Sequence, residues 1–380
     1  MALARNMEQA RLVEFFAVVG RSSSLAGRPS QRQIDQVSSS EKPDGITFAP
    51  CVLTQFPKET KHTTIEPKAI CQFCFPRGLQ LSSRESPPTY FTSILTDGSG
   101  RRHYVCVLTV TEELTTLHRT LLFLGVRLPK ETKEKEATKG TEEPATTATP
   151  ATQLQPKWLM DASCPVYCPR SLCIVSRYPF TTQFKTFLQQ CVRIALSSSP
   201  VPVERYVANF CAETPVPPRG MTSVDVTVAD QPLQFSRPPP NQLPMISSQS
   251  FESLFRSLDI NNVVLAWSCL LLEHKICLCS SSLSILTPAS SALLSLLFPF
   301  VWCGIYIPVL PHTLLDVIDA PVPFLVGIDV EYLRTTQPID RPEGVVFINL
   351  DTNEIHLGTD EEKGRGVLRE RPCLPKHDVS

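Results

Sequence analysis

A long apolar stretch dominates the C-terminal half of the chain. No Asp, Glu, Lys or Arg occurs between Ile276 and Leu315. Such a stretch must be buried in protein or in lipid, because leaving one large apolar side chain in water costs roughly 1.5–3 kcal/mol. A membrane-spanning helix needs about 20 apolar residues without interruption. This stretch is instead divided into pieces of strand and helix length by Pro288, Pro299, Pro308 and Pro311.

The prolines favour the interior of an α/β domain over a membrane helix. Each proline lacks a backbone donor and costs about 3 kcal/mol or more inside a helix. Leu293 to Phe298 suit a helix that Pro299 ends. Because Pro308 lies within Ile305 to Leu310, this segment suits a strand only at a sheet edge or with the proline at a strand end. The predicted order is strand, helix, strand, helix, and no transmembrane segment is expected.

The first third of the chain is rich in β-forming runs. Leu12 to Val19, Ile70 to Phe75 and Tyr90 to Leu95 each predict a strand. An Asp-Gly-Ser-Gly turn separates two such runs, so Tyr90 to Val110 predicts a hairpin. Thr111 and the two glutamates after it predict the start of a helix, because Thr can cap and acidic residues suit the positive end of the helix dipole.

Apolar residues in the second half recur every three or four positions, which is typical of helices. The spacing predicts helices over Thr181 to Ser198, Phe251 to Leu258 and Ile260 to Leu272. The last of these is apolar on nearly all sides, so we expect it to be buried. Val203 to Cys211 predicts a short helix or strand, and the β-rich runs that flank Asp351 predict a terminal hairpin.

Composition divides the chain into two lobes. Residues 129–157 contain almost nothing large and apolar, so they cannot bury enough surface to offset the entropy of ordering them. We expect a disordered linker there, between a small α/β lobe over residues 1–128 and a larger α/β lobe over residues 158–358. Residues 359–380 are charged and are expected to form a tail.

Net charge indicates which partners to expect, and the positions of the cysteines indicate the cellular compartment. The 380 residues carry a formal net charge of −1, so no bulk field attracts nucleic acid, and we expect none as a partner. Most of the 14 cysteines lie within apolar runs, where a free cysteine behaves as a small buried side chain. Charged residues interrupt the apolar run near the N-terminus, so no signal peptide is expected. A reducing, cytoplasmic location is therefore favoured.

Residues with catalytic or metal-binding chemistry are scattered. Cys71 and Cys74 have the spacing of a metal or redox pair, but on a strand they would face opposite sides, and further ligands are lacking. The seven histidines lie in no nucleophile or metal motif, and the sequence contains no phosphate-binding or dinucleotide-binding glycine loop. His274 and Lys275 follow a predicted helix, where we expect them to cap its end. The sequence thus predicts no catalytic residue, no metal and no cofactor.

The order of the apolar segments resembles the central part of a DENN domain. The segments that carry this resemblance are Leu270–Ile276, Ser280–Thr287, Leu297–Trp302, Tyr306–Pro311 and Ala320–Gly327. Upstream, Cys71–Leu79 and Tyr104–Val110 resemble the first DENN lobe, and Ser171–Phe180 resembles the start of the central lobe. The resemblance covers roughly residues 10–335.

DENN proteins act as guanine-nucleotide exchange factors for Rab-type small GTPases, so the resemblance implies this activity and this partner. It also implies a longin-like upstream lobe and an α/β central lobe that together grip the switch regions of the GTPase. Such a protein makes and breaks no covalent bond. The residues matched to the family motifs are expected to be mostly structural: Glu273, Tyr306, Pro308, Asp316, Pro321 and Phe324.

The resemblance leaves two other functions open. A complete DENN module has a third, helical part, whose place after residue 358 is taken here by a charged stretch, so a DENN-fold adaptor without exchange activity is one alternative. A GTPase-activating component that contributes an arginine is another. Peripheral recruitment to vesicle membranes is compatible with either. Candidates for the partner surface are Arg177, Arg219, Arg237 and Asn241.

Overall fold

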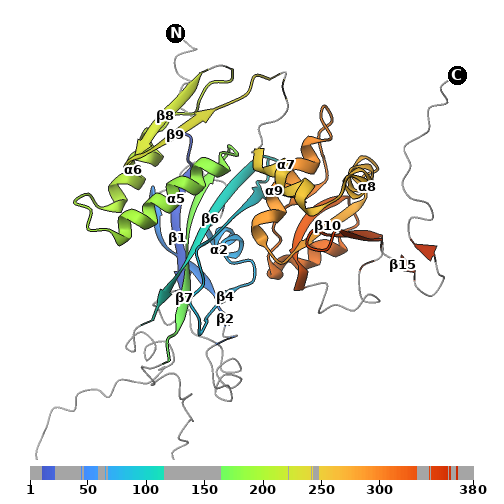
Figure 1. The fold of residues 1–380 in the computed structure, drawn as a ribbon, viewed down its shortest axis with the longest axis horizontal. Helices are drawn as coiled ribbons and strands as arrows, with labels where there is room; N and C mark the ends of the chain where they lie inside the picture. The colour runs from blue at the N-terminus through green and yellow to red at the C-terminus, as the bar shows by residue number, and fades with distance from the viewer. Residues whose placement is uncertain are drawn as a thin grey trace, which may run out of the picture.

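Two five-stranded sheets with helices around and between them form the fold, which confirms the expected α/β class (Figure 1). The structure is a computed structural model. It describes residues 11–21, 44, 47–58, 65, 67–114, 164–220, 222–240, 242, 248–331, 342, 344–357, 359–360 and 365–366.

The first sheet is antiparallel throughout and has the strand order β3-β1-β7-β6-β5. β5 and β6 form the hairpin that the Asp-Gly-Ser-Gly turn predicts, so this prediction is confirmed. A separate short pair joins β2 (Thr47–Phe48) to β4 (Leu79–Gln80). The strands of the sheet are β1 (Phe15–Arg21), β3 (Pro50–Phe56), β5 (Thr89–Thr96), β6 (Arg102–Glu113) and β7 (Tyr167–Ser176).

Successive side chains of these strands point to opposite faces, and different elements cover each face. On the first face, Phe16 and Cys106 pack in a core together with two helices and a hairpin. On the second face, Phe15 and Val105 pack in a core together with one helix and with the second lobe. The covering elements are α5 (Thr181–Leu196), α6 (Val203–Glu213), β8 (Ser223–Val228) and β9 (Gln231–Ser236) on the first face, and α2 (Pro67–Cys74) on the second.

The second sheet has the order β11-β12-β10-β13-β14, in which all neighbours are parallel except the last pair. Its strands are β10 (Lys275–Ser280), β11 (Ile305–Ile307), β12 (Phe324–Asp329), β13 (Val345–Asn349) and β14 (Glu354–Leu357). The helical elements of this lobe are α7 (Ser248–Ser257), α8 (Ile260–Leu271), α9 (Leu283–Ser295) and the 3-10 helix η2 (His312–Asp319).

α9 lies between the two sheets and joins their cores. Leu286, Ala289 and Leu293 are fully buried, and they belong to one apolar cluster that reaches from Val105 in the first sheet to Leu278 in the second. Figure 1 shows α9 beside the strands of the first sheet. The two lobes therefore share a single core across this helix.

The strand predicted over Ile70 to Phe75 is wrong, because this segment lies in α2. Its apolar residues fit both an alternating and a helical spacing, and a run this short does not separate the two. Pro67 begins the helix, where its missing N–H is not needed.

The helix predicted to start at Thr111 is also wrong, since β6 continues to Glu113. Thr111 and Glu112 pair with Pro169 and Cys168 of β7, so pairing across strands outweighs the local capping signal. Residues 115–163 lie outside the described residues.

Pro288 does not divide the apolar stretch, because it lies inside α9. It is the sixth of the 13 residues, so one interior backbone hydrogen bond is lost, and the burial of the helix between the two sheets offsets this cost. β11, in contrast, is an edge strand that ends before Pro308, as predicted.

The division between the sheets does not follow the boundary expected at residue 158. β7 lies in the middle of the first sheet, and α5, α6, β8 and β9 cover that sheet. We therefore propose that the first structural lobe extends to about residue 240 and that the second begins with α7. The expected linker at 129–157 lies outside the described residues, and within the expected tail at 359–380 the described part is β15 (Thr359–Asp360) and β16 (Arg365–Gly366).

The remaining helices and hairpin form where they were predicted, but the expectation that α8 is buried on nearly all sides is wrong, because Ile260 and Val264 are exposed. The periodic segments form α5, α7 and α8, and Val203 to Cys211 is helical within α6. β13 and β14 pair as the expected terminal hairpin. α9 ends at Ser295, before Pro299.

Glu273 ends α8 through its backbone. Its φ of 55° is in the left-handed region, its N–H donates to the carbonyl of Leu270, and the N–H of His274 donates to that of Cys269. This is the Schellman arrangement, in which glycine is usual because a Cβ is unfavourable in the left-handed conformation.

We predict that Glu273→Gly raises the free energy of unfolding by about 0.5–1 kcal/mol, because glycine relieves this conformation. Glu273→Ala, which removes the carboxylate but keeps the Cβ, is the control and should give no such gain. Urea titration measures both. A glycine variant no more stable than the alanine variant would contradict the assignment.

Candidate interaction site at the lobe junction

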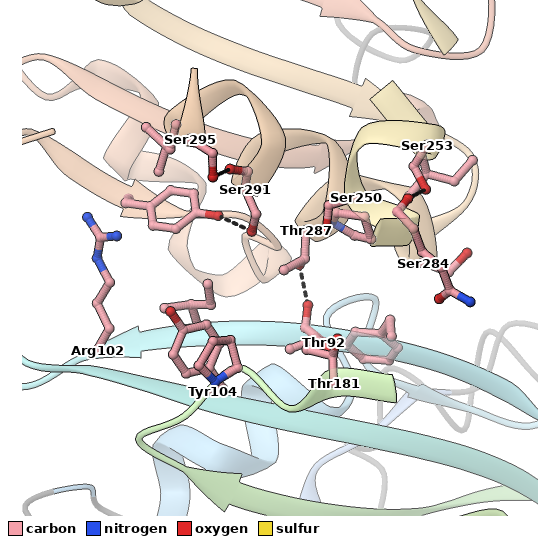
Figure 2. Close-up of a pocket in the computed structure, with 18 of the residues that line it drawn as sticks. Thr92, Arg102, Tyr104, Thr181, Ser250, Ser253, Ser284, Thr287, Ser291 and Ser295 are labelled. Atoms are coloured by element: carbon pink, nitrogen blue, oxygen red, sulfur yellow. Dashed lines mark hydrogen bonds between the residues drawn. The ribbon is translucent and has the colours of Figure 1, made fainter. Parts of the chain in front are cut away.

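Polar contacts complement the apolar core where the lobes meet. Thr287 on α9 donates a hydrogen bond from its hydroxyl to the carbonyl of Thr92 on β5, and both residues are buried (Figure 2). Arg77, which follows α2, pairs with Asp329 at the end of β12 and donates to the carbonyl of Ser281 at 2.8 Å. These contacts hold the first lobe against the second.

Arg77 also fills a position where α/β proteins commonly bind ligands. β10 and β12 are parallel, and in open α/β sheets ligands bind outside the carboxyl ends of the strands. Here Ser281 and Asp329 at those ends are contacted by Arg77. The carboxyl edge of the second sheet thus serves in joining the lobes.

A pocket of about 370 Å³ lies along the junction. β5, β6 and the start of α5 form one wall, and α7, α9 and β11 form the other. Its charged lining residues are Arg102 and Lys185, and none of its described lining residues is Asp or Glu. Many of the others carry hydroxyl groups, among them Thr92, Thr181, Ser250, Ser253, Ser284 and Ser291.

One end of the pocket is organised around Tyr306. Its hydroxyl lies 3.0 Å from the hydroxyl of Ser290 and 3.2 Å from that of Ser291, and the guanidinium of Arg102 lies over its ring, 5.0 Å from the centroid. Burial raises the pKa of Tyr306, and burial followed by the nearby Tyr306 raises that of Tyr104 to about 12. Both phenols are therefore neutral donors at physiological pH.

Apolar side chains are exposed beside this end. The exposed fractions are 46% for Phe298, 71% for Phe300 and 79% for Val301, and the last two residues line the pocket. Clustered exposed apolar residues next to a groove are a feature of protein-binding surfaces. The junction therefore offers an apolar contact and a polar pocket side by side.

The residues matched to the family motifs occupy mainly structural positions. Tyr306 and Phe324 are buried in β11 and β12, and Pro308 follows β11 with its carbonyl packed against Gly327. Asp316 in η2 and Pro321 before β12 are exposed. Of this set, Tyr306 is at the junction pocket, and Glu273 lies at the end of α8.

The structure brings together two of the proposed surface arginines. Arg219 and Arg237 form an isolated parallel bridge, and the guanidinium of Arg237 lies 4.8 Å from the centroid of the Tyr178 ring. Arg219 is exposed, and Asn241 lies outside the described residues. Their role in partner binding stays a prediction.

Arg177 belongs to an ion-pair cluster in the first lobe. Its Nε lies 2.6 Å from Oε1 of Glu14, whose Oε2 lies 2.6 Å from Nδ1 of His103. His103 is fully buried, and its Nε2 lies 3.3 Å from Oδ2 of Asp97. The cluster therefore connects the turn between β5 and β6 to the segment that enters β1.

Sequence reasoning did not identify Arg102, Lys185 and Ser250 as pocket residues. They lie on β6, α5 and α7. Nothing in the sequence around them distinguishes them from ordinary surface residues or from residues at the start of a helix. Only the packing of α9 against β5 places them around one cavity. No local motif could have found them.

Cys71 and Cys74 lie one turn apart on α2, so the prediction that they face opposite sides of a strand is wrong. Both are buried, and burial raises the pKa of Cys71 to about 11 and that of Cys74 well above its ordinary value. In the part of the chain that the structure describes, no group of three or more Cys, His, Asp or Glu residues could hold a metal ion. The two thiols pack as apolar core.

Comparisons with known proteins agree with this architecture. A family model for the DENN (AEX-3) domain matches residues 167–353, and one for the uDENN domain matches residues 50–110. A DENN domain-containing protein of Schizosaccharomyces pombe is 34% identical over 154 residues, which are 40% of this chain and 16% of that relative. The chain belongs to the DENN domain family, as its segment order predicts. Of the helices described, none has the length and apolarity to cross a bilayer.

The Glu14 and His103 pair makes stability depend on pH. The hydrogen bond to Glu14 raises the pKa of His103, although burial opposes it. Burial raises the pKa of Glu14, but hydrogen bonds and charges from His103 and Arg177 outweigh burial and lower it. The contribution of His103 is thus fully present below its unfolded pKa of about 6.5 and is lost as the pH rises through its raised folded pKa.

We predict that the free energy of unfolding of the wild type declines as the pH rises from about 6.5 through the raised pKa of folded His103, and that His103→Gln flattens this part of the profile. His312→Gln changes an exposed histidine of η2 and should keep the wild-type slope. Urea titrations at each pH provide the measurement. An unchanged slope in His103→Gln would show that the cluster does not carry this dependence.

Proposed function

We propose that this protein is a guanine-nucleotide exchange factor for a Rab-type small GTPase, which it binds across the lobe junction. Membership in the DENN family supports the class of partner. The observation that carries the placement is the exposure of Phe300 and Val301 beside a pocket to which both lobes contribute.

Exposure of these side chains is unfavourable unless a partner covers them. Burying a large apolar side chain contributes roughly 1.5–3 kcal/mol, so Phe300 and Val301 can supply a substantial share of a binding energy. Leu196 is even more exposed, at 85%, but it lies at the far end of α5 and lines no part of the pocket. The junction is therefore the better candidate for a docking surface.

The proposed activity requires no covalent chemistry. An exchange factor binds the nucleotide-free GTPase more tightly than the GDP-bound form, and by linkage it weakens GDP binding by the same factor. The continuous apolar core across the junction favours a preorganised surface, which loses little conformational entropy on binding.

Release of labelled GDP from a panel of Rab proteins, with and without this chain, tests the proposal. We expect faster release from at least one of them. Val301→Asp places a charge at the docking surface and should reduce the rate enhancement at least tenfold, a loss of about 1.4 kcal/mol. Leu196→Asp is the matched control and should keep wild-type activity.

Other outcomes identify the alternatives. Equal binding to the GTP, GDP and nucleotide-free forms, without faster release, would favour an adaptor. Faster GTP hydrolysis that is abolished by Arg219→Ala or Arg237→Ala would favour a GTPase-activating component. Equal activity of the Val301→Asp and Leu196→Asp variants would show that the GTPase docks elsewhere.

A further inference from the structure

Three helices begin at the same end of the junction pocket, away from Arg102. Residues from the first turns of α5, α7 and α9 line it, and in Figure 2 Ser250 and Ser284 lie on one wall and Thr181 on the facing wall. The helices have 16, 10 and 13 residues, so each presents a developed positive end of its dipole. Their convergence makes this end of the pocket electropositive.

At the start of α9, the carboxylate of Asp351 accepts a hydrogen bond from the N–H of Ser281, so it offsets part of the positive end of that helix. None of the three helices has an acidic residue in its first turn. The N-cap residues of α5 and α9, Phe180 and Ser282, form no side-chain capping hydrogen bond. Helix starts of this kind leave backbone N–H groups for an external acceptor.

Two side chains at this end also lack a protein partner. Ser250 is 5% exposed and lines the pocket, yet its hydroxyl has no hydrogen-bond partner among the described residues. Its Oγ is not among the fully buried, unpaired side-chain atoms of the described residues, so it is open to the pocket and available to hydrogen-bond a ligand. Lys185 lies over the Tyr90 ring at 5.6 Å from the centroid, and no described carboxylate pairs with its ammonium group.

We propose that this end of the pocket binds the phosphate group of a small phosphate monoester. A phosphate has several acceptor oxygens and about two negative charges, which match converging N–H groups, the Ser250 hydroxyl and the Lys185 ammonium better than a single carboxylate does. The remaining volume, lined by further hydroxyls and by Phe91, accommodates a compact polar body such as a phosphorylated polyol.

The ligand would contact both lobes at once. Thr181 and Lys185 belong to α5, which covers the first sheet, whereas Ser250 and Ser284 belong to the second lobe. A phosphate that binds only the folded protein therefore stabilises it against unfolding, and the stabilisation increases with the phosphate concentration. This proposal does not depend on exchange activity.

Thermal unfolding of the full chain with inorganic phosphate and with myo-inositol 1-phosphate tests the site, with sodium chloride at matched ionic strength as the salt control. We expect both phosphates to raise the unfolding temperature in a saturable way and sodium chloride to leave it nearly unchanged. Lys185→Met should weaken phosphate binding at least tenfold, and Ser250→Ala at least threefold. Arg193→Met removes one positive charge at the opposite end of α5 and should bind as the wild type does.

Vesicles that contain phosphatidylinositol 4-phosphate distinguish a lipid headgroup from a soluble ligand. Binding to these vesicles that Lys185→Met abolishes, and for which myo-inositol 1-phosphate competes, supports the site with a lipid source. A response to the soluble phosphates alone supports the site with a soluble source. Absence of any response, or an equal response in the wild type and Lys185→Met, overturns the proposal.

Discussion

The burial of α9 between two sheets is the constraint on which the rest of the structure depends. An isolated helix of 13 residues is marginal in water, and this one contains Pro288. It is stable because both lobes pack against it: Leu286, Ala289 and Leu293 are fully buried. The hydroxyl of Thr287 completes the arrangement, since its acceptor is a carbonyl of the first lobe. Each lobe thus supplies part of the environment that the other needs.

This constraint positions the candidate interaction surface. Because α9 holds β5 beside β11, Arg102 of the first lobe reaches Tyr306 of the second, and the turn after α9 presents Phe300 and Val301 at the edge of the same pocket. Arg77 occupies the carboxyl edge of the second sheet, where many α/β proteins bind their ligands. We therefore propose the junction, rather than this edge, as the docking surface for a partner.

The sequence predicts the elements with long or regular patterns and misses those decided by tertiary context. The 16 residues of α5 repeat at helical spacing over four turns, so their pattern is unambiguous. Ile70 to Phe75 is too short for such a test, and at Thr111 the capping signal competes with pairing to β7, which local reasoning does not include. The pocket could not be predicted at all, because Lys185 and Ser250 are 65 positions apart in the chain and meet only when α9 packs on β5.

The coupling of the lobes is tested most directly by destabilising one and observing the other. Leu188 is fully buried in α5, on the side of the first sheet away from α9, so Leu188→Ala should cost roughly 2–5 kcal/mol. In a background with Trp158→Phe and Trp302→Phe, Trp267 on α8 reports on the second lobe; Trp302 is replaced because it lines the pocket between the lobes. If the lobes fold as one unit, tryptophan fluorescence and far-ultraviolet circular dichroism will show a single transition at the same lowered temperature. A fluorescence transition that stays at the original temperature, together with circular dichroism that shows two steps, would contradict the coupling of the two lobes.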